Sequence, residues 1–201
     1  MSQSKRLLAV LLLNISMITG LIIVGLSSHS LGVLAAGGDY VADSAAILLG
    51  LLAIYLRDKK NGHPLATTIV AGINASLLLI VTILVITESI HRLNTHTPHI
   101  QGLPAMIISI VATIAMVIGA LILAGDKNDK DLHIRSVMLD TMADGVSSAA
   151  VAVTGGIIFF TKRYFWLDSA AALIIGIVIG VTAIKLMRDV VKTMLRKNNS
   201  A

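Results

Sequence analysis

Six long apolar stretches, separated by short polar segments, dominate the pattern of this chain. Each is about twenty residues or longer, which lets an α-helix cross a hydrocarbon core of roughly 30 Å. The stretches lie at Leu7–Leu26, Leu31–Leu56, Leu65–Thr87, Leu103–Ala124, Ile134–Phe160 and Leu167–Met187. The pattern therefore predicts an all-α membrane protein with six transmembrane helices.

The connections between the stretches are too short to hold a second domain. We expect one six-helix membrane domain over residues 1–189 and a short basic cytoplasmic tail over residues 190–201. The first stretch follows Lys5 and Arg6, as the apolar part of a signal peptide follows its basic start. The stretch is longer than such a segment and lacks a small-residue cleavage site, so we expect an uncleaved first helix.

The basic residues orient the predicted helices, because Lys and Arg near helix ends are retained on the cytoplasmic side of a membrane. With six helices, only Arg92, Lys162 and Arg163 of the sixteen basic residues fall on the side opposite the N-terminus. We therefore expect both termini in the cytoplasm. The compact chain with its short tail suggests a multi-pass protein of a bacterial inner membrane.

Composition narrows the classes of function. Hydrophobic residues make up 56% of the chain, charged residues 13%, and the mean hydropathy is +0.88, so lipid is the expected solvent. The net charge of +5 does not indicate nucleic-acid binding, because the basic residues form short clusters between apolar stretches and aromatic residues are only 3%. The absence of cysteine excludes disulfides and thiolate metal sites.

Four aspartates lie inside the apolar stretches: Asp39 and Asp43 in the second, and Asp140 and Asp144 in the fifth. A carboxylate at the centre of a bilayer costs on the order of 3 kcal/mol, so a charged residue there indicates a function. Each pair is spaced i, i+4, which places both carboxyl groups on one helix face about one turn apart. Two matched pairs on two helices can converge on one cavity.

Like charges this close repel each other unless they share protons or bind a cation. Four carboxyl groups form a hard, oxygen-rich site that suits a divalent metal ion, and a bound metal would displace protons from it. Metal and protons then compete for the same oxygens. This competition is the chemistry that a metal/proton antiporter requires, with the metal as a transported ion and no permanently bound cofactor.

The four aspartates allow two other interpretations. The aspartates could be protonated hydrogen-bonding groups that stabilise helix packing in a non-catalytic membrane scaffold. The segment Gly38-Asp39-Tyr40 superficially matches an element of intramembrane aspartyl proteases. Such an enzyme needs one aspartate dyad that shares a proton, and four aspartates in two pairs exceed this requirement, so we expect a protein that is not an enzyme.

Two motifs carry a family resemblance. The second stretch begins with Ser30-Leu31-Gly32-Val33-Leu34-Ala35 and continues to Asp39-Tyr40-Val41-Ala42-Asp43, and the fifth contains Asp140-Thr141-Met142-Ala143-Asp144 followed by Ser148. At these residues the chain resembles the transmembrane domain of the cation diffusion facilitator family, whose members are proton-coupled exporters of divalent transition metals. The resemblance covers nearly the whole chain. It implies a six-helix cation-efflux fold, with Asp39, Asp43, Asp140 and Asp144 as metal ligands.

Weaker matches to the family are Asn14, His63-Pro64, Glu88 and Trp166-Leu167-Asp168. Three of these residues have a second interpretation. Asn14 is either an interhelical hydrogen-bonding group or part of the ion path. His63 is either a polar residue at a helix end or a group that admits metal. Asp168 is either favoured at a helix N-terminus by the helix dipole or a gating residue.

The chain departs from the family pattern in ways that bear on its metal and its assembly. Zinc-selective members usually place a histidine in the four-residue site, whereas this chain has four aspartates. An all-carboxylate site resembles the manganese or iron branch, although zinc, cobalt and cadmium would also bind by affinity order. A cytosolic domain that helps many members to dimerise is absent from this chain, so we expect a homodimer to form through the helices, in the lipid bilayer.

Overall fold

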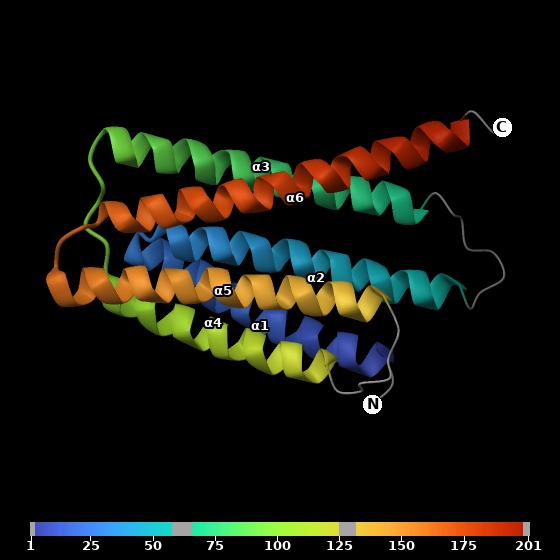
Figure 1. Cartoon of the computed structure of the whole chain (residues 1–201), viewed down its shortest axis with the longest axis horizontal. Coiled ribbons are helices and arrows are strands. Elements are labelled where there is room, and N and C mark those ends of the chain that lie inside the picture. Colours follow the sequence, from blue (N-terminus) through green and yellow to red (C-terminus); the bar gives the residue numbers. More distant parts are fainter. Residues whose placement is uncertain (1–2, 58–65, 125–131, 199–201) are drawn as a thin grey trace.

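The computed structural model describes residues 3–57, 66–124 and 132–198, and within them it consists of six helices (Figure 1). The helices are α1 (Gln3–Ser28), α2 (Leu31–Arg57), α3 (Ala66–Asn94), α4 (Gly102–Leu123), α5 (Leu132–Thr161) and α6 (Trp166–Asn198). By length and apolar composition, five of them contain stretches able to cross a membrane: Arg6–Ser28, Gly72–Asn94, Gly102–Leu123, Thr141–Thr161 and Trp166–Leu195. The sixth helix, α2, is not one of these five and packs against α1 and α3. The predicted all-α membrane fold is confirmed.

The helices form two groups. The helices α1, α2, α4 and α5 pack against one another as a four-helix bundle, and α3 pairs with α6 along the side where α2 lies. Figure 1 shows the α3–α6 pair along one edge of the molecule, with the start of α1 and the end of α6 at the same end of the bundle. The main core cluster runs through the middle and includes Leu21, Val33, Tyr40, Met116 and Val151.

Small residues set the closest approaches between helices. A Cβ atom added to Gly102 on α4 would lie 2.6 Å from the carbonyl oxygen of Gly155 on α5. A Cβ atom added to Gly38 on α2 would lie 2.7 Å from a methyl group of Val81 on α3. Lipid supplies little hydrophobic drive for helix association, so close backbone packing of this kind stabilises membrane bundles.

Large apolar side chains cover the outside of the bundle. Val146 is 72% exposed and Phe160 is 80% exposed, and many Ile and Leu side chains on the same outward faces are more than half exposed. In water such a surface would promote aggregation, whereas in a bilayer it contacts acyl chains. The exposed apolar faces therefore agree with the membrane assignment.

The helix ends differ from the apolar boundaries in two places. The helix α3 continues to Asn94 and α6 to Asn198, both beyond the expected apolar spans. The residues that follow the apolar part are polar or basic and are still good helix formers, so apolar continuity marks the edge of the hydrocarbon rather than the end of the helix. Residues 190–198 of the predicted tail are accordingly a continuation of α6.

Candidate metal centre

The antiparallel helices α2 and α5 bring the two predicted aspartate pairs together. At the start of α2, a Cβ atom on Gly32 would lie 3.2 Å from a methyl group of Val151. Two turns further along α2, the Tyr40 hydroxyl lies 3.4 Å from the Ser148 hydroxyl. The next contact in the same register joins the side chains of Asp43 and Asp144.

Asp43 and Asp144 are hydrogen-bonded to each other through their side chains. Asp39 also interacts with Asp144. The Asp144 side chain is 7% exposed, and its Oδ2 atom has no hydrogen-bond partner. The site therefore contains a contact between two carboxyl groups and an unpaired acceptor oxygen within the helical bundle.

The fourth predicted ligand, Asp140, lies in α5, but its side chain is outside the part of the chain whose side chains are described. Among the side chains that are described, no three His, Asp or Glu residues form a group that could hold a metal ion. The described geometry is a hydrogen-bonded pair, Asp43 with Asp144, and Asp39 beside it. The four-aspartate metal site stays a prediction.

Tyr40 is a neighbour of the site that the sequence analysis did not single out. Its side chain is 1% exposed, and its hydroxyl donates a hydrogen bond of 3.3 Å to the carbonyl oxygen of Ala112 on α4. A buried tyrosine usually finds a partner for its hydroxyl, so a tyrosine between two intramembrane aspartates is a signal that could have been noticed. Tyr40 links α2 to α4 and α5 at the level of the aspartates.

Two further oxygens without partners lie near the same level of the bundle. The antiparallel helices α1 and α2 place Leu21 against Gly37, with a distance of 3.3 Å from the Leu21 Cβ to a Cβ added at Gly37. Continued along both helices, this register brings Asn14 to the level of Ser44. Both side chains are buried, and neither Asn14 Oδ1 nor Ser44 Oγ has a hydrogen-bond partner. Asn14 thus lies on the bundle interior, next in level to Asp43.

Asp168 occupies a different place, at the first turn of α6, and it is 2% exposed. Its Oδ1 accepts hydrogen bonds from the Ser30 hydroxyl at 2.5 Å and from the Gly32 N–H at 3.3 Å. Its Oδ2 accepts a bond from the Leu31 N–H at 2.7 Å. Asp168 therefore caps the N-terminus of α2, a neighbouring helix, in addition to lying at the start of its own.

Glu88 and Arg92 form an ion pair on α3, with 2.8 Å between Arg92 Nε and Glu88 Oε1. The Arg92 guanidinium also donates a 2.8 Å hydrogen bond to the carbonyl oxygen of His29 in the α1–α2 turn. These bonds tie α3 to the same turn that Asp168 contacts. His63, the remaining secondary residue, lies outside the described residues.

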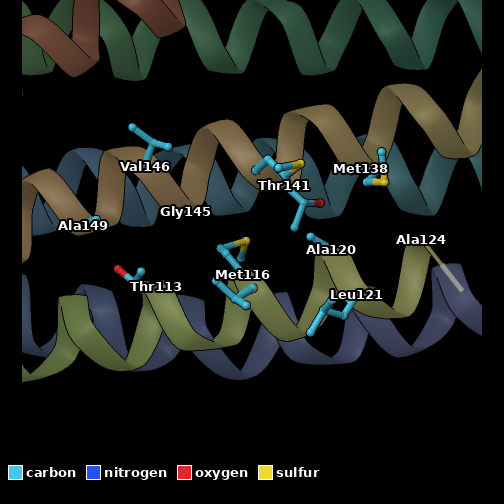
Figure 2. Close-up of a pocket in the computed structure, with 12 residues that line it drawn as sticks. Thr113, Met116, Ala120, Leu121, Ala124, Met138, Thr141, Gly145, Val146 and Ala149 are labelled. Carbon is cyan, nitrogen blue, oxygen red and sulfur yellow. The ribbon is translucent and has the colours of Figure 1, made fainter.

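An apolar groove runs between α4 and α5, with a volume of about 460 Å³. Figure 2 shows Met116 and Ala120 of α4 facing Thr141 and Gly145 of α5 across it. Among the side chains that the structure describes, no carboxyl group or histidine lines this groove. The groove is therefore separate from the contact between Asp43 and Asp144, which lies between α2 and α5.

The sequence of this chain is similar to those of known metal transporters. The chain is 29% identical over 195 residues to the zinc transporter ZitB of Yersinia pestis, covering 94% of this chain and 62% of that protein. It is 26% identical over 197 residues to a cadmium, cobalt and zinc/H(+)-K(+) antiporter of Bacillus velezensis, covering 92% and 62%. The metal cation efflux system protein CzcD of Cupriavidus metallidurans is 26% identical over 162 residues, covering 78% and 50%.

The chain thus spans less than two thirds of the length of these relatives. The family model of the cation efflux transmembrane domain matches residues 7–195, which is nearly the whole chain. The match includes both aspartate-bearing helices and the Asp168 cap. The resemblance to the cation diffusion facilitators is confirmed: the chain belongs to the family defined by the cation efflux transmembrane domain.

Proposed function

We propose that the protein exports divalent transition-metal ions in exchange for protons. The observation that carries this proposal is the contact between Asp43 and Asp144, a hydrogen-bonded carboxyl pair inside the bundle with one oxygen left unpaired. A buried acceptor without a partner costs about 1–3 kcal/mol or more, which a bound cation would offset. Asp39 and Asp140 complete the proposed ligand set.

Proton exchange follows from the chemistry of the pair. A metal ion binds carboxylates, so protons held by Asp43 and Asp144 must leave when the ion binds. When the site opens to the other side of the membrane, protons reload the carboxyl groups and release the metal. Alternating exposure of one site to the two sides thus couples the two fluxes without a covalent step.

The proposed metals follow from the names of the relatives and from the ligand types of the site. The named relatives transport zinc, cadmium or cobalt, and we take these ions as the first substrates to test. The four aspartates offer only oxygen ligands, which also suit manganese and iron. Asn14 Oδ1, unpaired near the same level, would add a neutral oxygen ligand or a hydrogen-bond acceptor for a metal-bound water. His63 is proposed as a group that receives metal at the cytoplasmic side.

The membrane setting completes the proposal. The apolar helices and the family support a multi-pass protein of a bacterial plasma membrane. We propose that both termini are cytoplasmic, as the distribution of Lys and Arg favours. We further propose that two copies associate through their helices in the bilayer.

The test is metal transport into proteoliposomes that contain the purified protein and a pH-sensitive dye. Zinc, cadmium, cobalt, manganese and iron are compared for the wild type, Asp144→Ala and the control Asp189→Asn, which alters an exposed carboxylate on α6. We expect metal to move in one direction and protons in the other for wild type and control, and neither for Asp144→Ala. Equal transport by Asp144→Ala, or metal flux without proton flux, would contradict the proposal.

A further inference from the structure

The contact of Asp168 with α2, which we call the α2–α6 junction, consists of Asp168, Ser30, Leu31 and Gly32. Both carboxylate oxygens of Asp168 accept hydrogen bonds, from one hydroxyl and two backbone N–H groups. The Ser30 hydroxyl in turn accepts a 3.2 Å bond from the Val33 N–H. The first three N–H groups of α2 therefore all have acceptors, and two of these acceptors belong to α6.

This arrangement is stronger than a helix needs for its own capping. The first N–H groups of a helix have no partners within the helix, and in a membrane each unsatisfied group is costly. A serine at the N-cap already supplies one acceptor. Here a carboxylate from another helix supplies the others, and its negative charge lies at the positive end of the α2 dipole.

The junction also connects to α5. Only residues 162–165 separate α5 from α6, and the Asp168 N–H donates to the Phe165 carbonyl oxygen at 3.3 Å. On α2, a Cβ atom at Gly32 would lie 3.0 Å from Asp168 Oδ1 and 3.2 Å from Val151 of α5. The start of α2 is thus fixed along its axis against the α5–α6 hairpin.

Fixing one end of α2 fixes the depth of its aspartates. Asp43 lies twelve residues after Leu31, which is about 18 Å along a helix. A slip of one residue would move Asp43 by about 1.5 Å and rotate it by about 100° around the helix axis. The contact between Asp43 on α2 and Asp144 on α5 would be lost on such a displacement.

We infer that Asp168 is a positioning residue for the metal site: it holds α2 in the register that places Asp39 and Asp43 against Asp144. The inference rests on the proposed transport function. Asp168 does not itself contact the metal. Its effect passes through the backbone of α2, so its loss should weaken metal binding even where the protein stays folded.

The experiment measures Zn²⁺ binding by calorimetry and thermal unfolding on the same purified protein in detergent. Asp168→Asn replaces one acceptor oxygen by an amide N–H₂ that faces the backbone N–H groups of α2. We expect the dissociation constant for Zn²⁺ to rise by about tenfold or more, the range typical of residues that orient ligands. The matched control is Ser169→Ala, which removes a fully buried hydroxyl without a hydrogen-bond partner and should bind as wild type does.

A double variant separates positioning from simple capping. In Ser30→Asp/Asp168→Ala the carboxylate is moved to the N-cap of α2, where aspartate caps as well as serine, and the bond to α6 is lost. We expect the unfolding temperature to recover towards that of the wild type while Zn²⁺ binding stays weak. Recovery of both would mean that Asp168 only caps α2, and the inference would be wrong.

The outcomes also separate this inference from the proposed function. If the wild type binds none of Zn²⁺, Cd²⁺, Co²⁺, Mn²⁺ and Fe²⁺ in the same calorimetry, the metal-transport proposal fails, and the positioning role falls with it. If the wild type binds Zn²⁺ and Asp168→Asn binds equally well, only the inference fails. Should Asp168→Asn not fold, Ser30→Ala removes a single hydroxyl of the junction and keeps both backbone bonds, and it must still raise the dissociation constant.

Discussion

Two buried aspartates in this protein have opposite surroundings. Asp168 is 2% exposed, and both of its carboxylate oxygens accept hydrogen bonds from neutral donors. Asp144 is 7% exposed, shares a hydrogen bond with another carboxyl group and keeps one oxygen unpaired. Burial alone therefore does not distinguish a capping carboxyl group from a proposed metal ligand in a membrane. The difference lies in the partners.

The comparison has a physical basis. A buried polar group that is fully hydrogen-bonded stabilises its surroundings, whereas a partly satisfied group costs stability. The carboxylate of Asp168 accepts hydrogen bonds from N–H groups of α2 that would otherwise be unpaired. Neither the buried carboxylate nor these N–H groups therefore lack a partner. Asp144 and Asp43 have no cationic partner among the described side chains, and under the proposed function this cost remains until a cation binds. A site that must bind and release an ion cannot be satisfied permanently by the protein.

The largest effect on transport is expected for Asp43→Asn, which removes one of the two carboxyl groups that contact each other. Asparagine keeps a hydrogen bond to Asp144 but removes one carboxylate and its proton. We expect transport to fall by about a hundredfold or more, beyond the effect of losing a group that merely orients a ligand. The thermal unfolding temperature should stay the same or rise, because a pair of like acidic groups is replaced by a neutral partner. Proteoliposome flux and unfolding in detergent, measured on one preparation, check both expectations.

The control for Asp43→Asn is Asp189→Asn, a change in an exposed carboxylate on α6. This variant should retain the full flux. A variant Asp43→Asn that transports at the wild-type rate would show that the carboxyl pair is a packing contact, and the contrast between Asp144 and Asp168 would lose its functional meaning.

The converse change, Asp168→Ala, should act first on stability. It leaves the N–H groups of Leu31 and Gly32 without acceptors in an apolar setting, at a cost of about 1–3 kcal/mol each. We expect a lower unfolding temperature, measured by circular dichroism, and loss of protection of these two amides in hydrogen exchange. Ser169→Ala, the buried neighbour without a hydrogen bond, should unfold as the wild type does. Unchanged protection of the two amides would contradict the capping role.

A smaller effect is expected at Gly32, where the junction touches both α5 and α6. An alanine there would place its Cβ 3.0 Å from Asp168 Oδ1 and 3.2 Å from Val151. Both distances are shorter than ordinary van der Waals contacts, so the side chains of Asp168 and Val151 must move by a few tenths of an ångström, and we expect a loss of about 1–2 kcal/mol in unfolding free energy. Gly156→Ala is the control, because its Cβ would meet only the flexible side chain of Met106, at 3.3 Å. Equal stability of the two variants would show that the junction is not closely packed.

Much of this picture is available from the sequence, and the reasons are specific. Apolar runs separated by polar loops are enough to predict six helices, because the bilayer sets a fixed length for each. The aspartates spaced i, i+4 identify one face on each of two helices, and both faces carry a pair of carboxyl groups. The sequence does not say which faces meet, so Tyr40 was overlooked and the relation between Asn14 and Ser44 was not predicted. These depend on the register between helices.

Asp168 illustrates the same limit. A carboxylate at a helix start is favoured by its own helix dipole, and the sequence alone predicts for Asp168 either this role or a gating role. Its actual partners, Ser30 and Leu31, lie more than a hundred residues away along the chain. Only the packing of α6 beside α2 creates the junction. Local signals thus predict the residue type at this position but not the helix that it caps.

The finest test concerns Ser44, whose buried hydroxyl has no hydrogen-bond partner and lies next to Asp43 in sequence. Removing an unpaired buried hydroxyl is nearly neutral for folding, so Ser44→Ala should leave the unfolding temperature unchanged or slightly raised. If the oxygen serves the bound ion or its water, the dissociation constant for Zn²⁺ should rise by about threefold, the loss of one modest hydrogen bond. Thr82→Val is the matched control, because the Thr82 hydroxyl is equally buried and unpaired but lies on α3 against Gly180. Equal binding by both variants would restrict the site to the carboxyl groups, whereas weaker binding by Ser44→Ala alone would extend the contrast with Asp168 to a neutral oxygen.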